Sequence, residues 1–65
     1  MARKRVQIRV TEPGLFSNQW QAKAVDAATG HDIDYCYGGD RREAVNKIMQ
    51  KMMARYGSDV EFLGV

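Results

Sequence analysis

The feature that most constrains the fold is a change of periodicity after residue 38. Up to that point apolar and polar residues alternate in three short segments: 4–11, 19–26 and 32–38. Such alternation is the pattern of half-buried β-strands. Beyond it the apolar residues recur at helical spacing as far as Gly57. The chain has 65 residues, which is enough for one domain only.

These elements predict an α+β fold for residues 1–65 as a single small domain. A three-stranded antiparallel sheet would pack one face on one C-terminal helix and leave the other face in water. Residues 60–65, which include Val60, Phe62 and Val65, would form either a short fourth strand or a tail folded back on the sheet. The element order is therefore βββα or βββαβ, and residues 1–3 are expected to be a disordered basic arm.

The alternation predicts which side chains face the helix. The expected inward rows are Val6, Ile8 and Val10, then Trp20, Ala22 and Ala24, and finally Ile33, Tyr35 and Tyr37. On the third strand this leaves Asp32, Asp34 and Cys36 pointing outward. The helix would cover the inward rows with one apolar stripe: Ala44, Val45, Ile48, Met49, Met52, Met53 and Tyr56.

Turn and cap residues separate these elements. Gly30 is placed to take the left-handed position of a hairpin loop that starts at Asp26. Asp40 is a good N-cap, and Glu43 three residues later completes a pattern like a capping box.

Leu15 and Phe16 lie in the connection between the first two strands. We expect them to cap one end of the core, and an exposed contact point is the alternative.

The chemistry of a catalytic site is missing from the sequence. His31 is the only histidine and follows a hairpin glycine, so it is expected to be a solvated turn residue. Cys36 has no histidine partner placed by local pattern, and Asp32 with Asp34 lacks a third metal ligand. We expect no enzyme activity, no metal and no cofactor.

The composition also predicts where the protein works. One cysteine cannot form an internal disulfide, which favours a reducing compartment, and we expect a cytoplasmic protein. No apolar run approaches the ~18 residues of a membrane span, so no membrane partner is expected.

Basic residues are concentrated in two places although the net charge is only +2. The first is the outward face of strands one and two, with an N-terminal arm, and its residues are Arg3, Lys4, Arg5, Gln7, Arg9, Gln19, Gln21 and Lys23. Arginine, lysine and glutamine are the side chains that contact phosphates and base edges. The second is a ridge on the helix at spacing i, i+4, i+8, made of Lys47, Lys51 and Arg55. Such a ridge is more often a solvated surface than a partner site, but in the leading hypothesis it anchors phosphates together with Arg3 and Lys4.

Several short motifs resemble two families of DNA-binding domains. They are Trp20-x-Ala22, Asp26-x-x-Thr29-Gly30, Gly39-Asp40 and Glu43-Ala44. The pattern is similar to the DNA-binding domain of plant ethylene-response factors and to the arm-site-binding domain of phage tyrosine integrases. The resemblance implies a three-stranded sheet that lies in the major groove of DNA. The residues that would contact the bases there are Arg5, Arg9, Gln19, Gln21 and Lys23. The chain departs from both families at Asp32 and Asp34, and Trp20 aligns with the buried row rather than with a reading surface.

The same helix start, Gly39-Asp40-x-x-Glu43-Ala44, also resembles the HicB-type antitoxin domain, a reduced ribonuclease-H-like fold. That resemblance implies a protein-binding module that covers a small toxin ribonuclease. The first strand has no acidic residue, so a working nuclease is excluded. Pairing of residues 60–65 with the first strand would favour the HicB-like fold.

The leading hypothesis from the sequence is a non-enzymatic nucleic-acid-binding module, with duplex DNA as the favoured partner and a phage or other mobile element as its origin. The alternative is a protein-interaction module of antitoxin or inhibitor type. A homodimer is compatible with either.

Overall fold

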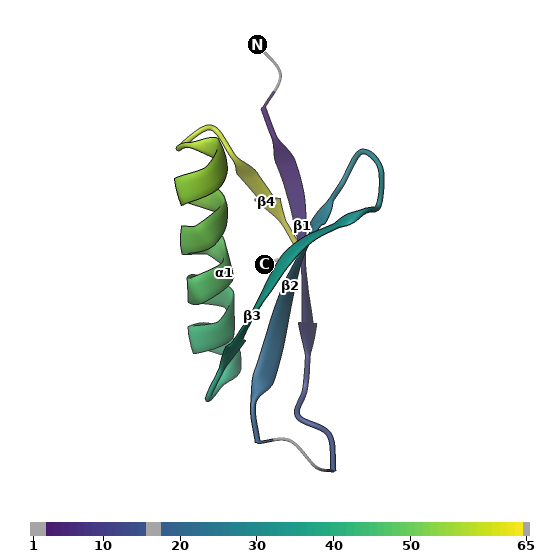
Figure 1. Cartoon of the computed structure of the whole chain (residues 1–65), viewed down its shortest axis with the longest axis vertical. Coiled ribbons are helices and arrows are strands. Elements are labelled where there is room, and N and C mark those ends of the chain that lie inside the picture. The colour runs from purple at the N-terminus through teal and green to yellow at the C-terminus, as the bar shows by residue number, and fades with distance from the viewer. Residues whose placement is uncertain (1–2, 16–17, 65) are drawn as a thin grey trace.

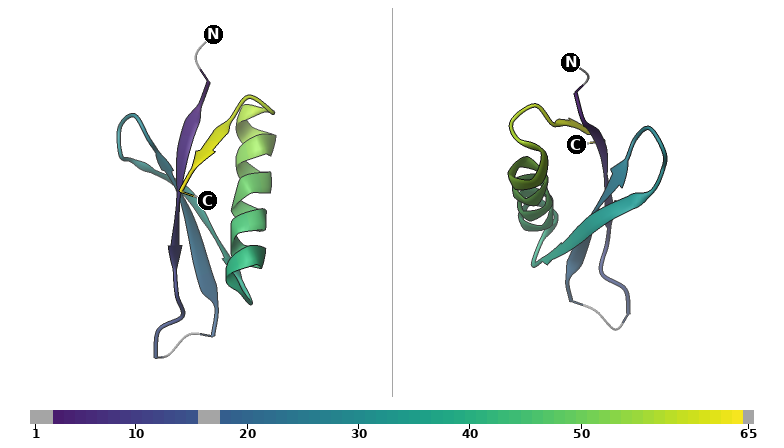
Figure 2. Two further views of the ribbon diagram at one scale, coloured as in Figure 1. Left: turned by 180° about the vertical axis from the view of Figure 1, so that it is seen from behind. Right: turned by 45° about the horizontal axis from the view of Figure 1, so that its top comes forward.

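The computed structural model describes residues 3–15 and 18–64. The elements follow in the order β1 (Arg5–Thr11), β2 (Trp20–Asp26), β3 (Asp32–Gly38), α1 (Arg41–Tyr56) and β4 (Glu61–Leu63). The sheet order is β3-β2-β1-β4, in which β1, β2 and β3 are antiparallel neighbours and β4 runs parallel to β1. Helix α1 lies along one face of this sheet (Figures 1 and 2). The predicted α+β class is confirmed.

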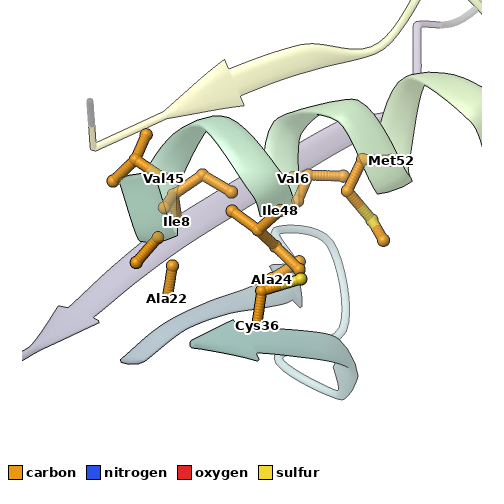
Figure 3. Packing of buried hydrophobic residues seen from close by; sticks show 9 residues of the cluster. Val6, Ile8, Ala22, Ala24, Cys36, Val45, Ile48 and Met52 are labelled. Atoms are coloured by element: carbon orange, nitrogen blue, oxygen red, sulfur yellow. The ribbon is translucent and has the colours of Figure 1, made fainter. Parts of the chain in front are cut away.

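The core lies between α1 and the inner face of the sheet, which is the face that α1 covers (Figure 3). Its buried residues are Val6 and Ile8 of β1, Ala22 and Ala24 of β2, Cys36 of β3, and Ala44, Val45, Ile48 and Met52 of α1. Figure 3 shows Ile48 extending from α1 towards Ala24 and Cys36. The two alanines of β2 are short, so the helix can pack closely over the middle of the sheet.

The caps of α1 agree with the sequence pattern. The Asp40 carboxylate accepts a hydrogen bond from the Glu43 N–H at 2.7 Å, and the Glu43 carboxylate accepts one from the Gly39 N–H at 3.3 Å. At the other end the Gly57 N–H donates to the Met53 carbonyl at 2.8 Å. These bonds pair backbone groups that have no partner inside the helix.

The predicted orientation of β3 is wrong from Asp34 onward. Ala24 pairs with Asp34 but Val25 pairs with Asp32, so Ile33 is an extra residue in the ladder. A bulge of this kind shifts the alternation of every residue after it. Cys36 is therefore buried in the core, whereas Tyr35 and Tyr37 are exposed on the side where Asp34 and Cys36 were expected.

Two smaller predictions about the core are also wrong. Met53, placed in the buried stripe of the helix, is 42% exposed. Leu15, which was expected to cap one end of the core, is 97% exposed and therefore lies on the surface. Phe16 lies outside the described residues, as do Met1 and Ala2 of the expected arm.

Residues after the helix form a short strand rather than a loose tail. Val6 of β1 pairs with Phe62, which packs against the core, and Gln7 pairs with Leu63. Val65 lies outside the described residues. The hairpin between β2 and β3 has Gly30 at φ +80°, as predicted. Within residues 3–15 and 18–64, no helix has the length and apolar character needed to cross a membrane.

Candidate nucleic-acid interface

The predicted strand residues come together on the outer face, which is the sheet face opposite α1. The register of β1 and β2 places Arg9 directly opposite Lys23, and Gln7 opposite Val25. Thr11 is opposite Gln21. Arg5 belongs to the same alternating row of β1 as Gln7 and Arg9, because side chains two apart in a strand share a face. Five of the residues predicted for strands one and two therefore share this face: Arg5, Gln7, Arg9, Gln21 and Lys23. Gln19 is exposed one residue before β2 begins.

Two tyrosines join these residues on the outer face. Tyr35 pairs with Lys23 and Tyr37 pairs with Gln21. As whole residues, Tyr35 is 52% exposed and Tyr37 is 45% exposed. The ring centroids are 5.5 Å apart with an interplanar angle of 78°, which is an edge-to-face contact. We call Tyr35 and Tyr37 the tyrosine pair. Sequence reasoning missed it because the bulge at Ile33 reverses the alternation, and the available signal was Cys36, a residue type that is usually buried.

The charges of the outer face are only loosely paired. Arg5 Nε lies 3.5 Å from a carboxylate oxygen of Glu61, and Lys23 Nζ lies 3.5 Å from one of Asp32. Among the described residues Arg9 has no ion-pair partner. Exposed ion pairs contribute about 0–1 kcal/mol, so an approaching phosphate can take over these cations at small cost.

A shallow hollow of about 360 Å³ opens beside the tyrosine pair. It is lined by Gln21, Lys23, Asp32, Ile33, Asp34 and Tyr35. The hollow is lined by residues of β2 and of the bulged part of β3, and it presents an amide, an ammonium group and carboxylates next to an aromatic ring. These are hydrogen-bond donors and acceptors of the kind that bind polar heterocycles.

Lys4, by contrast, is used within the fold. Its ammonium nitrogen lies 2.5 Å from a carboxylate oxygen of Asp26 and 5.1 Å from the centre of the Tyr56 ring. The hydrogen bond from Lys4 holds the pKa of Asp26 below its usual value, and the same bond raises the pKa of Lys4. Lys4 therefore joins the start of β1 to the end of β2, while Arg3 before it is exposed and outside any strand.

The predicted helix ridge lies along the outer edge of β3 rather than on the outer face. Lys47 Nζ is 3.3 Å from a Glu43 carboxylate oxygen and donates a hydrogen bond of 3.3 Å to the Tyr37 carbonyl. Lys51 Nζ is 3.6 Å from a carboxylate oxygen of Asp34. Asp34 was expected to point outward, but this contact holds it beside α1.

The third residue of the ridge, Arg55, lies with its guanidinium carbon 5.6 Å from the centre of the Tyr56 ring.

The groups considered for catalysis do not converge. His31 is exposed in the hairpin, where its backbone N–H donates to the Thr29 hydroxyl at 3.3 Å, and Cys36 is a free thiol buried in the core. In the part of the chain that the structure describes, no three His, Cys, Asp or Glu residues lie close enough to hold a metal ion. Asp32 and Asp34, which were considered as a pair of metal ligands, form ion pairs with Lys23 and Lys51 respectively.

Since a fold of this kind hosts many functions, the outer face is the feature from which a function can be argued. Comparisons of the chain with models of protein families, with curated proteins and with solved structures find no match.

Proposed function

We propose that this protein is a non-enzymatic nucleic-acid-binding module that uses the outer face of its sheet. The observation that carries the proposal is the register of β1 and β2, which brings Arg5, Arg9 and Lys23 to one face together with the amides of Gln7 and Gln21. Cations on such a face bind phosphates, and amides beside them hydrogen-bond base edges. Arg9, which has no ion-pair partner among the described residues, is the first phosphate contact that we assign.

The position of β4 bears on the form of nucleic acid that fits. The sequence predicted that β1 and β2 enter the major groove of duplex DNA, which is about 12 Å wide and admits a two-stranded ribbon. Because β3 and β4 flank this ribbon, the sheet is four strands and about 14 Å wide between its outer backbones, before side chains are added. Flat docking in a major groove therefore has less support than binding of phosphates and bases outside a groove.

The remaining expectations are compatible with this role. A free buried cysteine fits a reducing compartment, and we propose that the protein acts in the cytoplasm. An origin in a phage or other mobile element is part of the same proposal, because it is where the resembling integrase domains occur.

The proposal predicts salt-dependent binding that depends on β1. With fluorescently labelled duplex and single-stranded oligonucleotides, the logarithm of the association constant should fall linearly with the logarithm of the salt concentration. Arg5→Ala combined with Arg9→Ala should weaken binding of every sequence and reduce the salt slope by about 1–2, because each phosphate contact contributes about 0.7–0.9 to it.

The matched control is Arg42→Ala, which removes a cation from an exposed position in the first turn of α1, away from the outer face. This variant should leave the slope nearly unchanged. Absence of binding to both duplex and single strands at low ionic strength would overturn the proposal.

A second candidate function is supported by β4. Its parallel pairing with β1 is the arrangement expected for the HicB-like fold, which would make the protein an antitoxin-type partner of a small ribonuclease. Addition of a strand at the edge of β3 has less support, because the Tyr35 N–H already donates to Asp34 at 2.7 Å and the Tyr37 carbonyl already accepts from Lys47. A partner is therefore not expected to pair with this edge.

The test of this second function is inhibition. The tagged protein, purified from its native cells, should bring down a small ribonuclease in a one-to-one complex and should block its cleavage of RNA in a dose-dependent assay. Purification of the protein alone, combined with the salt-dependent binding described above, would dismiss this candidate.

A further inference from the structure

We propose that the nucleic acid is single-stranded and that its bases stack on the tyrosine pair, Tyr35 and Tyr37. This inference rests on the proposed function and specifies its ligand. The strands supply two exposed aromatic rings on the same face as Arg9 and Lys23. Aromatic rings beside cations on a sheet are a general solution for holding unpaired bases, because every base has a π-face.

The geometry of the tyrosine pair suits stacking. The rings are held on adjacent outward positions of one strand, and their edge-to-face contact leaves roughly half of each residue open to solvent. The backbone beneath them is fixed by pairing to Lys23 and Gln21 of β2. A base that stacks on either ring therefore meets a surface that is ordered before binding, which lowers the entropic cost of association.

Cations lie on both sides of the rings. On one side, β2 carries Lys23 opposite Tyr35, and β1 carries Arg9 opposite Lys23. On the other side, Lys47 contacts the Tyr37 carbonyl and Lys51 contacts Asp34 at the edge of β3. The three lysines form exposed ion pairs of 3.3–3.6 Å, and Lys47 also donates to the Tyr37 carbonyl. A strand that places bases on the rings would find phosphate-binding groups along either side.

The hollow beside Tyr35 offers hydrogen bonds to the edge of a stacked base. Gln21 provides an amide, Lys23 a donor and Asp32 an acceptor. Unpaired bases expose their Watson–Crick edges as well as their faces, and a pocket of mixed donors and acceptors can bind those edges. We assign the hollow to one base and the ring of Tyr35 to its face.

A duplex cannot use these features. Its bases are stacked on one another, so their faces are closed to protein rings, and only groove edges and phosphates are accessible. The outer-face cations could still bind duplex phosphates. The tyrosine pair would then contribute nothing to the affinity for duplex. Dependence of binding on the tyrosine pair therefore distinguishes a single-stranded ligand from a duplex.

The experiment measures fluorescence anisotropy with three probes of about 12 nucleotides: oligo(dT), oligo(rU) and a mixed-sequence DNA duplex. The informative variants are Tyr35→Val and Tyr37→Val, which keep a strand-favouring residue but remove the ring. Tyr35→Phe and Tyr37→Phe keep the ring and lose only the hydroxyl. Leu15→Ala removes an apolar side chain that is exposed and outside the strands, and serves as the matched control.

We expect at least one single-stranded probe to bind more tightly than the duplex, and the comparison of oligo(dT) with oligo(rU) identifies the sugar that is preferred. Each valine variant should weaken that binding by about 5- to 150-fold, as the loss of one stacked base does. The phenylalanine variants and Leu15→Ala should bind like the unmodified protein. Ring protons of Tyr35 and Tyr37 should move upfield in the NMR spectrum on binding, a shift that a purely structural role would not give.

Two results would overturn the inference, and they differ in what they say of the proposed function. Duplex binding that is at least as tight, sensitive to Arg9→Ala but unaffected by either valine variant, would reject stacking and retain nucleic-acid binding by the outer face. Absence of binding to all three probes would reject both and would leave the protein-binding function.

Discussion

At the scale of single residues, Gly38 decides how closely the helix approaches the sheet. It is the last residue of β3, is buried, and pairs with Trp20. A Cβ at this position would lie 2.5 Å from the Ala44 backbone nitrogen, so only a glycine lets the first turn of α1 rest there. Gly39 follows without this constraint, because a Cβ there would approach nothing closer than the Glu43 carboxylate at 4.0 Å.

We therefore expect Gly38→Ala to lower the free energy of unfolding by about 1–3 kcal/mol, the usual cost of forcing an extra group into a packed interior. Urea denaturation followed by circular dichroism measures the change. Gly39→Ala is the matched control and should change the free energy of unfolding by no more than about 0.5 kcal/mol. Equal effects of the two variants would show that α1 does not rest on Gly38.

At the scale of elements, β3 shows how a local irregularity governs the site. Its sequence alternates regularly, and regular alternation predicts Tyr35 and Tyr37 inward. The bulge opposite Ala24 and Val25 inserts Ile33 and reverses the strand after it. Within β3 only Cys36, a residue type that is usually buried, indicates the reversed alternation. The position of the bulge depends on the pairing with β2 and on which of Cys36 or the tyrosines fills the space under α1.

Helix α1 is the element that the sequence predicted best. Its N-cap, its end at Gly57 and the buried positions Ala44, Val45, Ile48 and Met52 agree with the helical pattern. Met53 departs from it because only one side of the helix meets the sheet, and the predicted stripe was half a turn wide. The two neighbouring methionines thus have opposite environments, with Met52 fully buried and Met53 exposed.

This contrast gives a matched pair of variants. We expect Met52→Ala to lower the free energy of unfolding by about 2–5 kcal/mol, because it leaves a cavity in a core built from few side chains. Met53→Ala should change it by about 0.5 kcal/mol or less. Thermal melting of both variants measures the difference, and melting temperatures that shift equally would show that the stripe of α1 is assigned to the wrong side.

At the scale of the whole molecule, six of the ten basic residues fall into three groups with different uses. Arg5, Arg9 and Lys23 lie on the outer face, Lys47 and Lys51 line the edge of β3, and Lys4 is bound to Asp26. The sequence predicted one arm and one ridge as phosphate anchors. The structure uses part of each to hold elements together, so the cations available for a ligand are those of the outer face and of the edge of β3.

The Lys4–Asp26 contact also makes global stability depend on pH. The pKa of Asp26 is lowered in the folded protein, so its contribution is present above about pH 4 and is lost as the pH falls through the folded pKa. The pKa of Lys4 is raised, so its contribution is present below about pH 10.4 and is lost as the pH rises through the folded value.

Asp26→Asn should therefore flatten the loss of stability below about pH 4 while keeping the oxygen that accepts from the Ala28 N–H. Asp59→Asn, at an exposed position outside any helix or strand, is the control and should leave the acid limb as steep as in the unmodified protein. Urea titrations at several pH values between about 2 and 7 measure both. An unchanged acid limb in Asp26→Asn would show that this contact does not couple folding to pH.

The amino-acid sequence by itself determined the number of strands before the helix, the side of β1 and β2 that faces the core, and both ends of α1. Each of these follows from local periodicity or from a cap within a few residues. Tertiary structure alone decided the face of the β3 tyrosines, the use of Lys4 and the pairing of β4 with β1. These features depend on contacts between segments far apart in the chain. Where two local arrangements are possible, the one that buries more apolar surface against those segments is adopted.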